Sequence, residues 1–349
     1  MFDHLAVRRI LGGVTALCGA LFAQYLGIPL PWLLGPMLSV AALRLSSAPV
    51  AAVKPLRAVG QWVIGVSLGL FFSVEILDLV TEHWMAILIG TTVPILISVF
   101  GTFVLSYVGR ADLKTAWFSS AIGGASEMSS LAERYGARVD LVASAHCLRI
   151  LAVVIVIPFG YLAWGLSGTD SSLLTARSLN WNQFPLLVSS TVLSGYIFKR
   201  LNVPTAWVLG PLFVAATLSI LGYTTTTLPT YLVNAGQLLI GWGLGDNYRP
   251  AFFKAAPRFL LGVAIFSAGA MGIAAFAGYV VSIITGLPLP TIWLGLAPGG
   301  LAEMAITAKV LNLGVPVVTA FQVCRLVFVV LVTGWFYKKY VSRLDNTGS

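Results

Sequence analysis

The chain carries two copies of one sequence unit. Gly-Gly-Ala-Ser-Glu-Met at 123–128 recurs as Gly-Gly-Leu-Ala-Glu-Met at 299–304, an offset of 176 positions (299 minus 123). Two further blocks recur at this offset to within one position: Pro-x-x-Trp-x-Leu-Gly-Pro at 29–36 and 204–211, and Gly-Gln-x-x-Ile-Gly-x-x-Leu-Gly at 60–69 and 236–245. Such self-similarity indicates two structural copies in one chain. We predict a first repeat over residues 1–178 and a second over residues 179–349, joined in one integrated domain.

The composition places this duplicated chain in a lipid bilayer. Hydrophobic residues make up 58% of the sequence and charged residues 9%, whereas a soluble domain carries about a quarter charged residues. Several segments, among them 85–105 and 259–285, reach the length of about 20 apolar residues that a membrane-crossing helix needs. The sequence therefore predicts an all-α polytopic membrane protein whose surroundings are the lipid bilayer.

We predict five spanning helices in each copy. The spans of the first copy lie at about 9–26, 31–45, 56–72, 84–107 and 141–165, and those of the second at 184–198, 204–221, 232–245, 259–284 and 315–337. Two segments are left over, 113–135 and 290–311, and each contains the repeated Glu-Met motif. Each is interrupted by Gly-Gly and holds a glutamate, so we predict a re-entrant or broken helix that does not complete a crossing.

The loops of the two copies alternate in charge. After the second span the first copy has Arg44, Lys54 and Arg57, whereas the second copy is uncharged over 222–230. After the third span the first copy is acidic and the second is basic over 249–258. Because Lys and Arg favour cytoplasmic loops, this alternation predicts inverted-topology repeats. Both termini would be cytoplasmic, in the inner (cytoplasmic) membrane of a bacterium. If both leftover segments crossed fully, the repeats would instead be parallel.

The Glu-Met motif is the candidate functional site. A Gly-Gly pair lets the backbone turn sharply and leaves its amides exposed, which at membrane depth is tolerated only inside protein or beside a water-filled cavity. Glu127 and Glu303 would lie in the first turn of the following short helix, and an acidic residue in a membrane segment indicates an ion or proton site. If the two carboxylates meet near the midplane, they can share one proton. The candidate residues for the solute and proton site are Gly123, Gly124, Ser126, Glu127, His146, Arg149, Gly299, Gly300, Glu303, Gln322 and Arg325.

A structural role for the same residues stays open. Each glutamate could instead cap its own helix or pair with the arginine 22 positions later, Arg149 or Arg325. These arginines also suit an anionic solute, because the guanidinium fork matches a carboxylate. His146 can titrate near neutrality, but Gln322 takes its place in the second copy, which favours a local hydrogen bond.

The two other repeated blocks have structural interpretations. In the Pro-x-x-Trp-x-Leu-Gly-Pro blocks, the first prolines suit the start of a helix, while Pro36 and Pro211 would break or kink its middle. The blocks at 60–69 and 236–245 contain Gly-x-x-x-Gly, which is typical of closely packed helix faces. Such faces would also permit a homodimer without requiring one.

Several function classes are disfavoured by what the sequence contains. The net charge of +9 is explained by Lys and Arg in cytoplasmic loops, and no nucleic-acid-binding motif accompanies it, so we expect no direct nucleic-acid binding. His4, His83 and His146 are far apart in the sequence, and a redox metal centre needs several converging ligands. We expect no metal, no cofactor and no enzymatic activity.

Taken together, the repeated Gly-Gly-x-x-Glu-Met and Pro-x-x-Trp-x-Leu-Gly-Pro blocks resemble the AbrB-type family of internally duplicated inner-membrane proteins of Gram-negative bacteria. The resemblance covers the whole chain. It implies an inner-membrane protein of a family whose members are catalogued as regulators of gene expression or, in some cases, as ammonia monooxygenases. The resemblance assigns no active site, so the candidate residues rest on the repeat alone.

The leading hypothesis is a secondary transporter that moves a small solute, with organic anions as the candidate class, coupled to protons through Glu127 and Glu303. The alternative is a membrane-embedded regulator of gene expression that acts through a partner or through the level of a transported metabolite. A structural assembly factor is a third reading, and it predicts neither a ligand nor flux.

Overall fold

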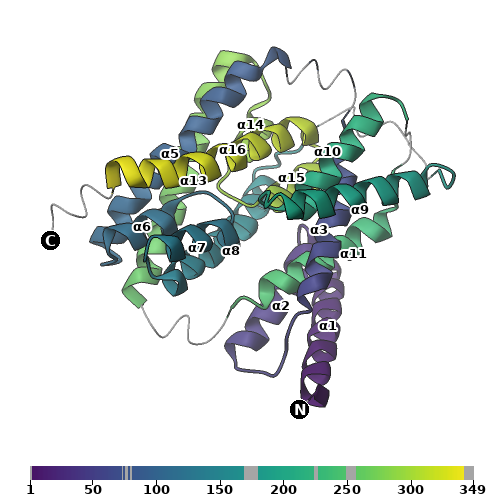
Figure 1. Cartoon of the computed structure of the whole chain (residues 1–349), viewed down its shortest axis with the longest axis horizontal. Coiled ribbons are helices and arrows are strands. Elements are labelled where there is room, and N and C mark those ends of the chain that lie inside the picture. Colours follow the sequence, from purple (N-terminus) through teal and green to yellow (C-terminus); the bar gives the residue numbers. More distant parts are fainter. Residues whose placement is uncertain are drawn as a thin grey trace. The chain divides into compact units, whose positions relative to one another are not determined.

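A computed structural model describes residues 2–72, 74, 78, 81–168, 180–223, 227–248 and 257–341, without the side chains of residues 2–4, 126 and 340. The described part of the chain forms fourteen α-helices (Figure 1). In the first half these are α1 (Phe2–Tyr25), α2 (Pro31–Leu45), α3 (Lys54–Gly69), α5 (Trp84–Tyr107), α6 (Leu113–Ser120), α7 (Ala125–Arg134) and α8 (Val139–Ala163). In the second half they are α9 (Phe184–Arg200), α10 (Ala206–Ile220), α11 (Thr230–Gly245), α13 (Pro257–Thr285), α14 (Leu289–Leu296), α15 (Leu301–Val310) and α16 (Val315–Phe336), followed by a π-helical turn, η2 (Tyr337–Val341). The predicted boundary between the repeats, at 178/179, lies outside the described residues.

Each of the ten predicted spans coincides with one helix, and the all-α prediction is confirmed. Five helices, α1, α5, α8, α13 and α16, are long and apolar enough to cross a membrane. The apolar helices α2 and α10 have 15 residues each, which at 1.5 Å per residue gives about 22 Å. This is shorter than the hydrocarbon core of about 30 Å, so the count of ten crossings stays a prediction.

The short helices α2 and α10 begin in the same unusual way. The residues that precede them, Leu30 (φ 52°) and Thr205 (φ 44°), both have left-handed backbone. Both helices then continue without interruption through Pro36 and Pro211. Of the predicted break or kink in mid-helix, the break is therefore wrong and the kink stays a prediction. A proline removes one backbone hydrogen bond, and packing of these helices on two neighbours is enough to hold them together.

The chain divides into two compact units, each of which contains helices of both sequence copies. Unit 1 comprises Met1–Leu79, Pro158–Pro250 and Ala305–Pro316, and unit 2 comprises Val80–Ile157, Ala251–Met304 and Val317–Ser349. In unit 1, α1 packs on α2 and α9 packs on α10 (Figure 1). The copies then exchange partners, because α3 packs on α10, α11 packs on α2, and α3 and α11 pack on each other.

Glycines make these contacts close. A Cβ atom on Gly65 of α3 would collide with the backbone carbonyl of Val208 in α10, and one on Gly241 of α11 would collide with that of Leu33 in α2. A Cβ on Gly60 would stand 2.6 Å from the carbonyl oxygen of Gly236. The Gly-x-x-x-Gly faces are therefore close-packing faces, as predicted, and they are used within the chain.

An ion pair between described residues joins the copies in unit 1. The Nε atom of Arg44, in the last turn of α2, lies 3.1 Å from Oδ1 of Asp246, which ends α11, and the two side chains are 16% and 23% exposed. At the equivalent place, Ser219 donates to the carbonyl of Leu70 at 3.5 Å.

We expect Asp246→Asn to lower the free energy of unfolding by about 1 kcal/mol, because the pair is only partly shielded from solvent. A double-mutant cycle with Arg44→Met, read by thermal unfolding in detergent, measures the coupling. Strictly additive effects of the two substitutions would show that the pair contributes nothing.

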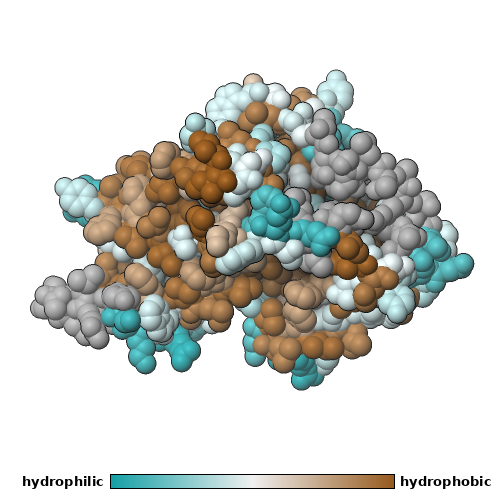
Figure 2. Space-filling model, turned by 90° about the horizontal axis from the view of Figure 1, so that it is seen from above, coloured by the Kyte–Doolittle hydropathy of each residue, from teal (hydrophilic) through white to brown (hydrophobic). Residues whose placement is uncertain are grey.

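In unit 2, α5 packs on α13, α6 packs on α5, and α14 packs on α13. One core joins Ile97 of α5, Phe266 of α13 and Phe321 of α16. A second core surrounds Trp117 and Met128. On the outside, large apolar side chains are exposed on the long helices, such as Phe103 (72%), Phe276 (71%) and Leu331 (70%). Figure 2 shows that brown, apolar residues dominate much of the face it displays, as expected for a surface in contact with lipid acyl chains.

Candidate functional site

Both copies of the Glu-Met motif follow a break between two short helices. In the first copy α6 ends at Ser120, the backbone becomes extended at Ala121 (ψ 129°), and α7 begins at Ala125. In the second copy α14 ends at Leu296, and Ala297 turns in the same way (ψ 135°) before α15 begins. The sequence predicted that each segment is either a re-entrant or a broken helix. The structure shows a broken helix in both. Whether either segment crosses the bilayer stays a prediction.

The two glycines of each motif make room for the side chains that follow them. A Cβ on Gly123 would stand 2.7 Å from the Met128 methyl group, and one on Gly299 would stand 2.8 Å from that of Met304. A Cβ on the second glycine, Gly124 or Gly300, would collide with the carboxylate of the glutamate three positions later. The motif is thus a local packing unit in which the methionine covers the first glycine and the glutamate covers the second.

The two glutamates therefore fold back over the start of their own helices. Glu127 and Glu303 stand at the third position of α7 and α15, where a carboxylate is stabilised by the positive end of the helix dipole. Glu303 is 7% exposed, and Glu127 is less completely buried. This position agrees with the capping interpretation and leaves a role in proton binding open. Ser126 lies in the first turn of α7, and its side chain is outside the described set.

A buried arginine spans each break. Arg149 of α8 donates from Nη1 to the Ala121 carbonyl at 2.9 Å and from Nη2 to the Gly123 carbonyl at 3.3 Å. Arg325 of α16 does the same at the equivalent residues. It donates from Nη1 to the Ala297 carbonyl and from Nη2 to the Gly299 carbonyl, the latter at 2.7 Å. The arginines are 1% and 5% exposed, so both charges are held inside the protein against backbone carbonyls.

His146 and Gln322 have the same role in the two copies. His146 Nε2 donates to the Phe118 carbonyl at 2.9 Å, and Gln322 Nε2 donates to the Leu294 carbonyl at 3.1 Å. In each case the acceptor lies 28 positions earlier, in the last turn of the helix that precedes the break. The local hydrogen bond favoured from the sequence is therefore confirmed. The carbonyls at the end of a helix lack intrahelical partners. His146 satisfies one of them in the first copy, whereas Gln322 Nε2 also donates to the Gly295 and Ala297 carbonyls, at 3.1 and 3.3 Å.

Each cluster also contains polar atoms that are not satisfied within the described part of the chain. Arg149 Nε, Arg325 Nε, His146 Nδ1 and Gln322 Oε1 are buried there without a hydrogen-bond partner. The charges that act on Arg325 include Glu303 of its own copy and Arg149 of the other, and all three residues belong to unit 2. A direct meeting of Glu127 with Glu303 stays a prediction. The two arginine Nε atoms are donors that can receive an anion or a water molecule, whereas Gln322 Oε1, and His146 Nδ1 in a neutral ring whose Nε2 donates, are acceptors that suit a water molecule.

Sequence reasoning missed the contacts of one half-buried cation, Lys309. Lys309, in the last turn of α15 and within unit 1, donates from Nζ to Ser67 Oγ at 3.2 Å and lies 5.1 Å from the centre of the Phe71 ring. Its counterpart in the first copy is Glu133, which is exposed. The only available signal was this charge reversal at equivalent positions.

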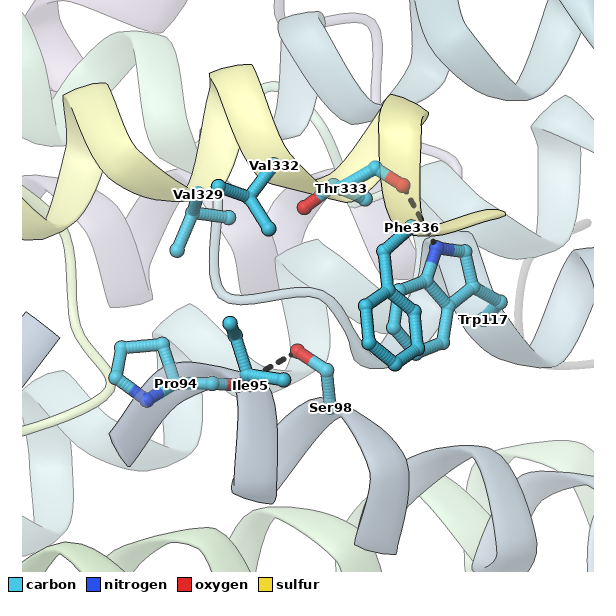
Figure 3. Close-up of a pocket in the computed structure, with 8 residues that line it drawn as sticks. All are labelled: Pro94, Ile95, Ser98, Trp117, Val329, Val332, Thr333 and Phe336. Atoms are coloured by element: carbon cyan, nitrogen blue, oxygen red, sulfur yellow. Dashed lines mark hydrogen bonds between the residues drawn. The ribbon is translucent and has the colours of Figure 1, made fainter. Parts of the chain in front are cut away.

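The described side chains also enclose a small pocket in unit 2, drawn in Figure 3. There the Trp117 indole donates to the Thr333 carbonyl at 3.3 Å and stacks on Phe336. Ser98 lies on the helix that faces Thr333 and Phe336 across the pocket. Its lining is mostly apolar, and none of the candidate site residues belongs to it. Among the described residues, no three His, Cys, Asp or Glu side chains come together in a way that could hold a metal ion.

Comparison with known proteins identifies the family. The family model described as "Transition state regulatory protein AbrB" matches residues 32–340. The chain is 26% identical over 346 residues to "Uncharacterized protein YhjN" of Bacillus subtilis (strain 168), covering 92% of this chain and 90% of that protein. It is 25% identical over 323 residues to "Putative regulator AbrB" of Escherichia coli (strain K12), covering 90% and 91%. Since the family match runs through both sequence copies, this chain belongs to the AbrB family of membrane proteins.

Proposed function

We propose that the protein is a secondary transporter that moves a small solute across the membrane, with organic anions as the favoured class. One observation carries this proposal: two broken helices have the same geometry, and each break is held by a buried arginine and headed by a glutamate. Broken helices in duplicated membrane proteins commonly frame solute sites. A cluster of buried charges is costly for a purely structural element, which favours a functional role.

The anion would bind between the guanidinium groups and the starts of α7 and α15. Each guanidinium has five N–H donors, and two of them are used by the break carbonyls in each copy. The remaining donors, together with the amides at the helix starts, suit a carboxylate. Glu127 and Glu303 would take up protons as the solute binds, because a neutral glutamate repels an anion less than an ionised one does.

The proposed architecture is two inverted repeats with five crossings each, in a bacterial inner membrane with both termini in the cytoplasm. The alternating loop charges support the inversion, and the equivalent contacts made by equivalent residues of the two copies support the repeat itself. We propose no enzymatic activity, no cofactor and no direct contact with nucleic acid. A homodimer would use surfaces other than the Gly-x-x-x-Gly faces, which pack within the chain.

A second candidate function is a membrane-embedded regulator of gene expression. It is favoured by one observation, the name "Putative regulator AbrB" of the Escherichia coli relative. The described residues consist mainly of helices and short connections, so a regulator built this way would act through a partner protein or through the level of a transported metabolite. Co-purification of a specific soluble partner, without solute binding, would favour this function.

The first test is a thermal-unfolding screen of the purified protein against small carboxylic and other organic anions at two pH values. A ligand that binds only the folded protein must raise its unfolding temperature. A specific, pH-dependent increase would identify the solute class to test in vesicles. If a broad panel produces no increase, solute binding loses its support and the regulator becomes the leading function.

In vesicles loaded with that solute, we expect Glu303→Gln to abolish flux driven by a pH gradient, because the amide cannot exchange a proton. The matched control is Glu133→Gln, which removes an exposed carboxylate from α7 and should leave flux unchanged. Unfolding temperature verifies that both variants are folded. Full pH-driven flux by Glu303→Gln would remove the coupling role from this residue.

A further inference from the structure

We infer that Arg149 and Arg325 are built-in cations that occupy, at the two helix breaks, the place where a coupling metal ion would otherwise bind. The last carbonyls of a helix carry the negative end of its dipole, and the carbonyls of the break that follows lie outside the helical hydrogen-bond pattern. In transporters with broken helices, unwound carbonyls and helix ends of this kind coordinate Na⁺. Here the carbonyls of Ala121 and Gly123 receive a guanidinium instead, and those of Ala297 and Gly299 receive another.

The contacts distinguish this role from simple neutralisation of a nearby glutamate. Both Nη groups of each arginine are directed at carbonyls on the two sides of the turn. The pattern is the same in both copies, although the neighbouring donor is His146 in one and Gln322 in the other. The arginines are anchored in the long helices α8 and α16, so each fixes a break to a continuous helix. They are positioning residues of the breaks.

One consequence concerns the coupling ion, and this part rests on the proposed transport function. A break whose carbonyls are already satisfied by a guanidinium has no need of a metal ion to balance its charge. We therefore expect solute flux to respond to a proton gradient and to be unaffected when Na⁺ is replaced by choline. Flux that requires Na⁺ would overturn the inference.

The direct test is chemical rescue of the purified full-length protein, and it does not depend on transport. Arg149→Ala and Arg325→Ala should each lower the unfolding temperature. Low millimolar guanidinium should then restore part of the loss, with a dependence on concentration that saturates as expected for a bound ligand. The wild-type protein should not respond to guanidinium, and neither variant should respond to urea, which has a similar shape and no charge. A lack of rescue in both variants would overturn the inference.

A second pair of variants covers the case in which the alanine variants do not fold. Arg325→Lys keeps the positive charge, whereas Arg325→Gln keeps hydrogen-bonding capacity without charge. We expect the lysine variant to retain a higher unfolding temperature than the glutamine variant, and the same order at Arg149. Equal stability of the lysine and glutamine variants would show that a cation is not required at the breaks. Absence of any flux in the wild-type protein would refute transport and leave these stability results interpretable.

Discussion

Gly65→Ala is expected to lower the free energy of unfolding by about 1–3 kcal/mol, the usual cost of overpacking a tight contact. The added methyl group would collide with the carbonyl of Val208, and a backbone atom cannot rotate out of the way as a side chain can. Gly241→Ala meets the carbonyl of Leu33 in the equivalent contact and should cost a similar amount. The two glycines face different partner helices, but α3 and α11 also pack on each other, so the double variant shows whether the two costs add or couple.

Thermal unfolding in detergent measures these effects, and Gly272→Ala is the matched control. Gly272 lies inside α13, and a Cβ atom there would meet open space. Replacing glycine by alanine in a helix without a clash is expected to stabilise by about 0.5–1 kcal/mol. If Gly65→Ala unfolded at the same temperature as this control, the conclusion that α3 and α10 are in close backbone contact at Gly65 would be wrong.

Gly300→Ala is expected to abolish pH-driven flux while leaving the protein folded. The new methyl group would occupy the place of the Glu303 carboxylate, which is the end of a flexible side chain and can swing away. The equivalent Gly124 has φ −67° and ψ 142°, a conformation open to any residue, so its alanine variant adds no backbone strain. The alanine variants of Gly300 and Gly124 test whether the glutamate carboxylates must lie at the helix starts, whereas Glu303→Gln tests whether a carboxylate is needed.

Flux and unfolding temperature are measured together for these variants, with Gly160→Ala as the control. Gly160 lies in α8 and faces open space, so its substitution should preserve both properties. Wild-type flux by Gly300→Ala would mean that Glu303 functions equally well away from the start of α15.

The positions of the helices were accessible from the sequence because apolar runs and repeated blocks both mark them. The Gly-Gly pairs likewise located the two breaks, and in the second copy Pro298 precedes the pair. The sequence could not predict which helices pack on each other in unit 1. Gly65-x-x-x-Gly69 indicates that another backbone approaches α3, but small residues carry no information about which helix that is. The exchange of α3 and α11 between the copies therefore required the structure.

The site shows a similar division. The spacing from each glutamate to its arginine suggested a pair, and the structure shows that the guanidinium groups bind break carbonyls. The sequence could not predict these acceptors, because every residue has a backbone carbonyl and residue identity does not show which one is used. His146 and Gln322 looked like a departure from the repeat because their side chains differ, yet both donate to the carbonyl 28 positions earlier. Hydrogen-bond capacity is retained at this position, while residue type is not.

The exchanged packing in unit 1 makes each copy depend on the other. Helix α3 has its close-packing partner in the second copy, and α11 has its partner in the first. A polypeptide with only one copy would leave both of these glycine faces uncovered, unless a second molecule of the same polypeptide supplied them. In this chain the two copies cover each other's glycine faces, so the interior of unit 1 is built like an interface between two molecules.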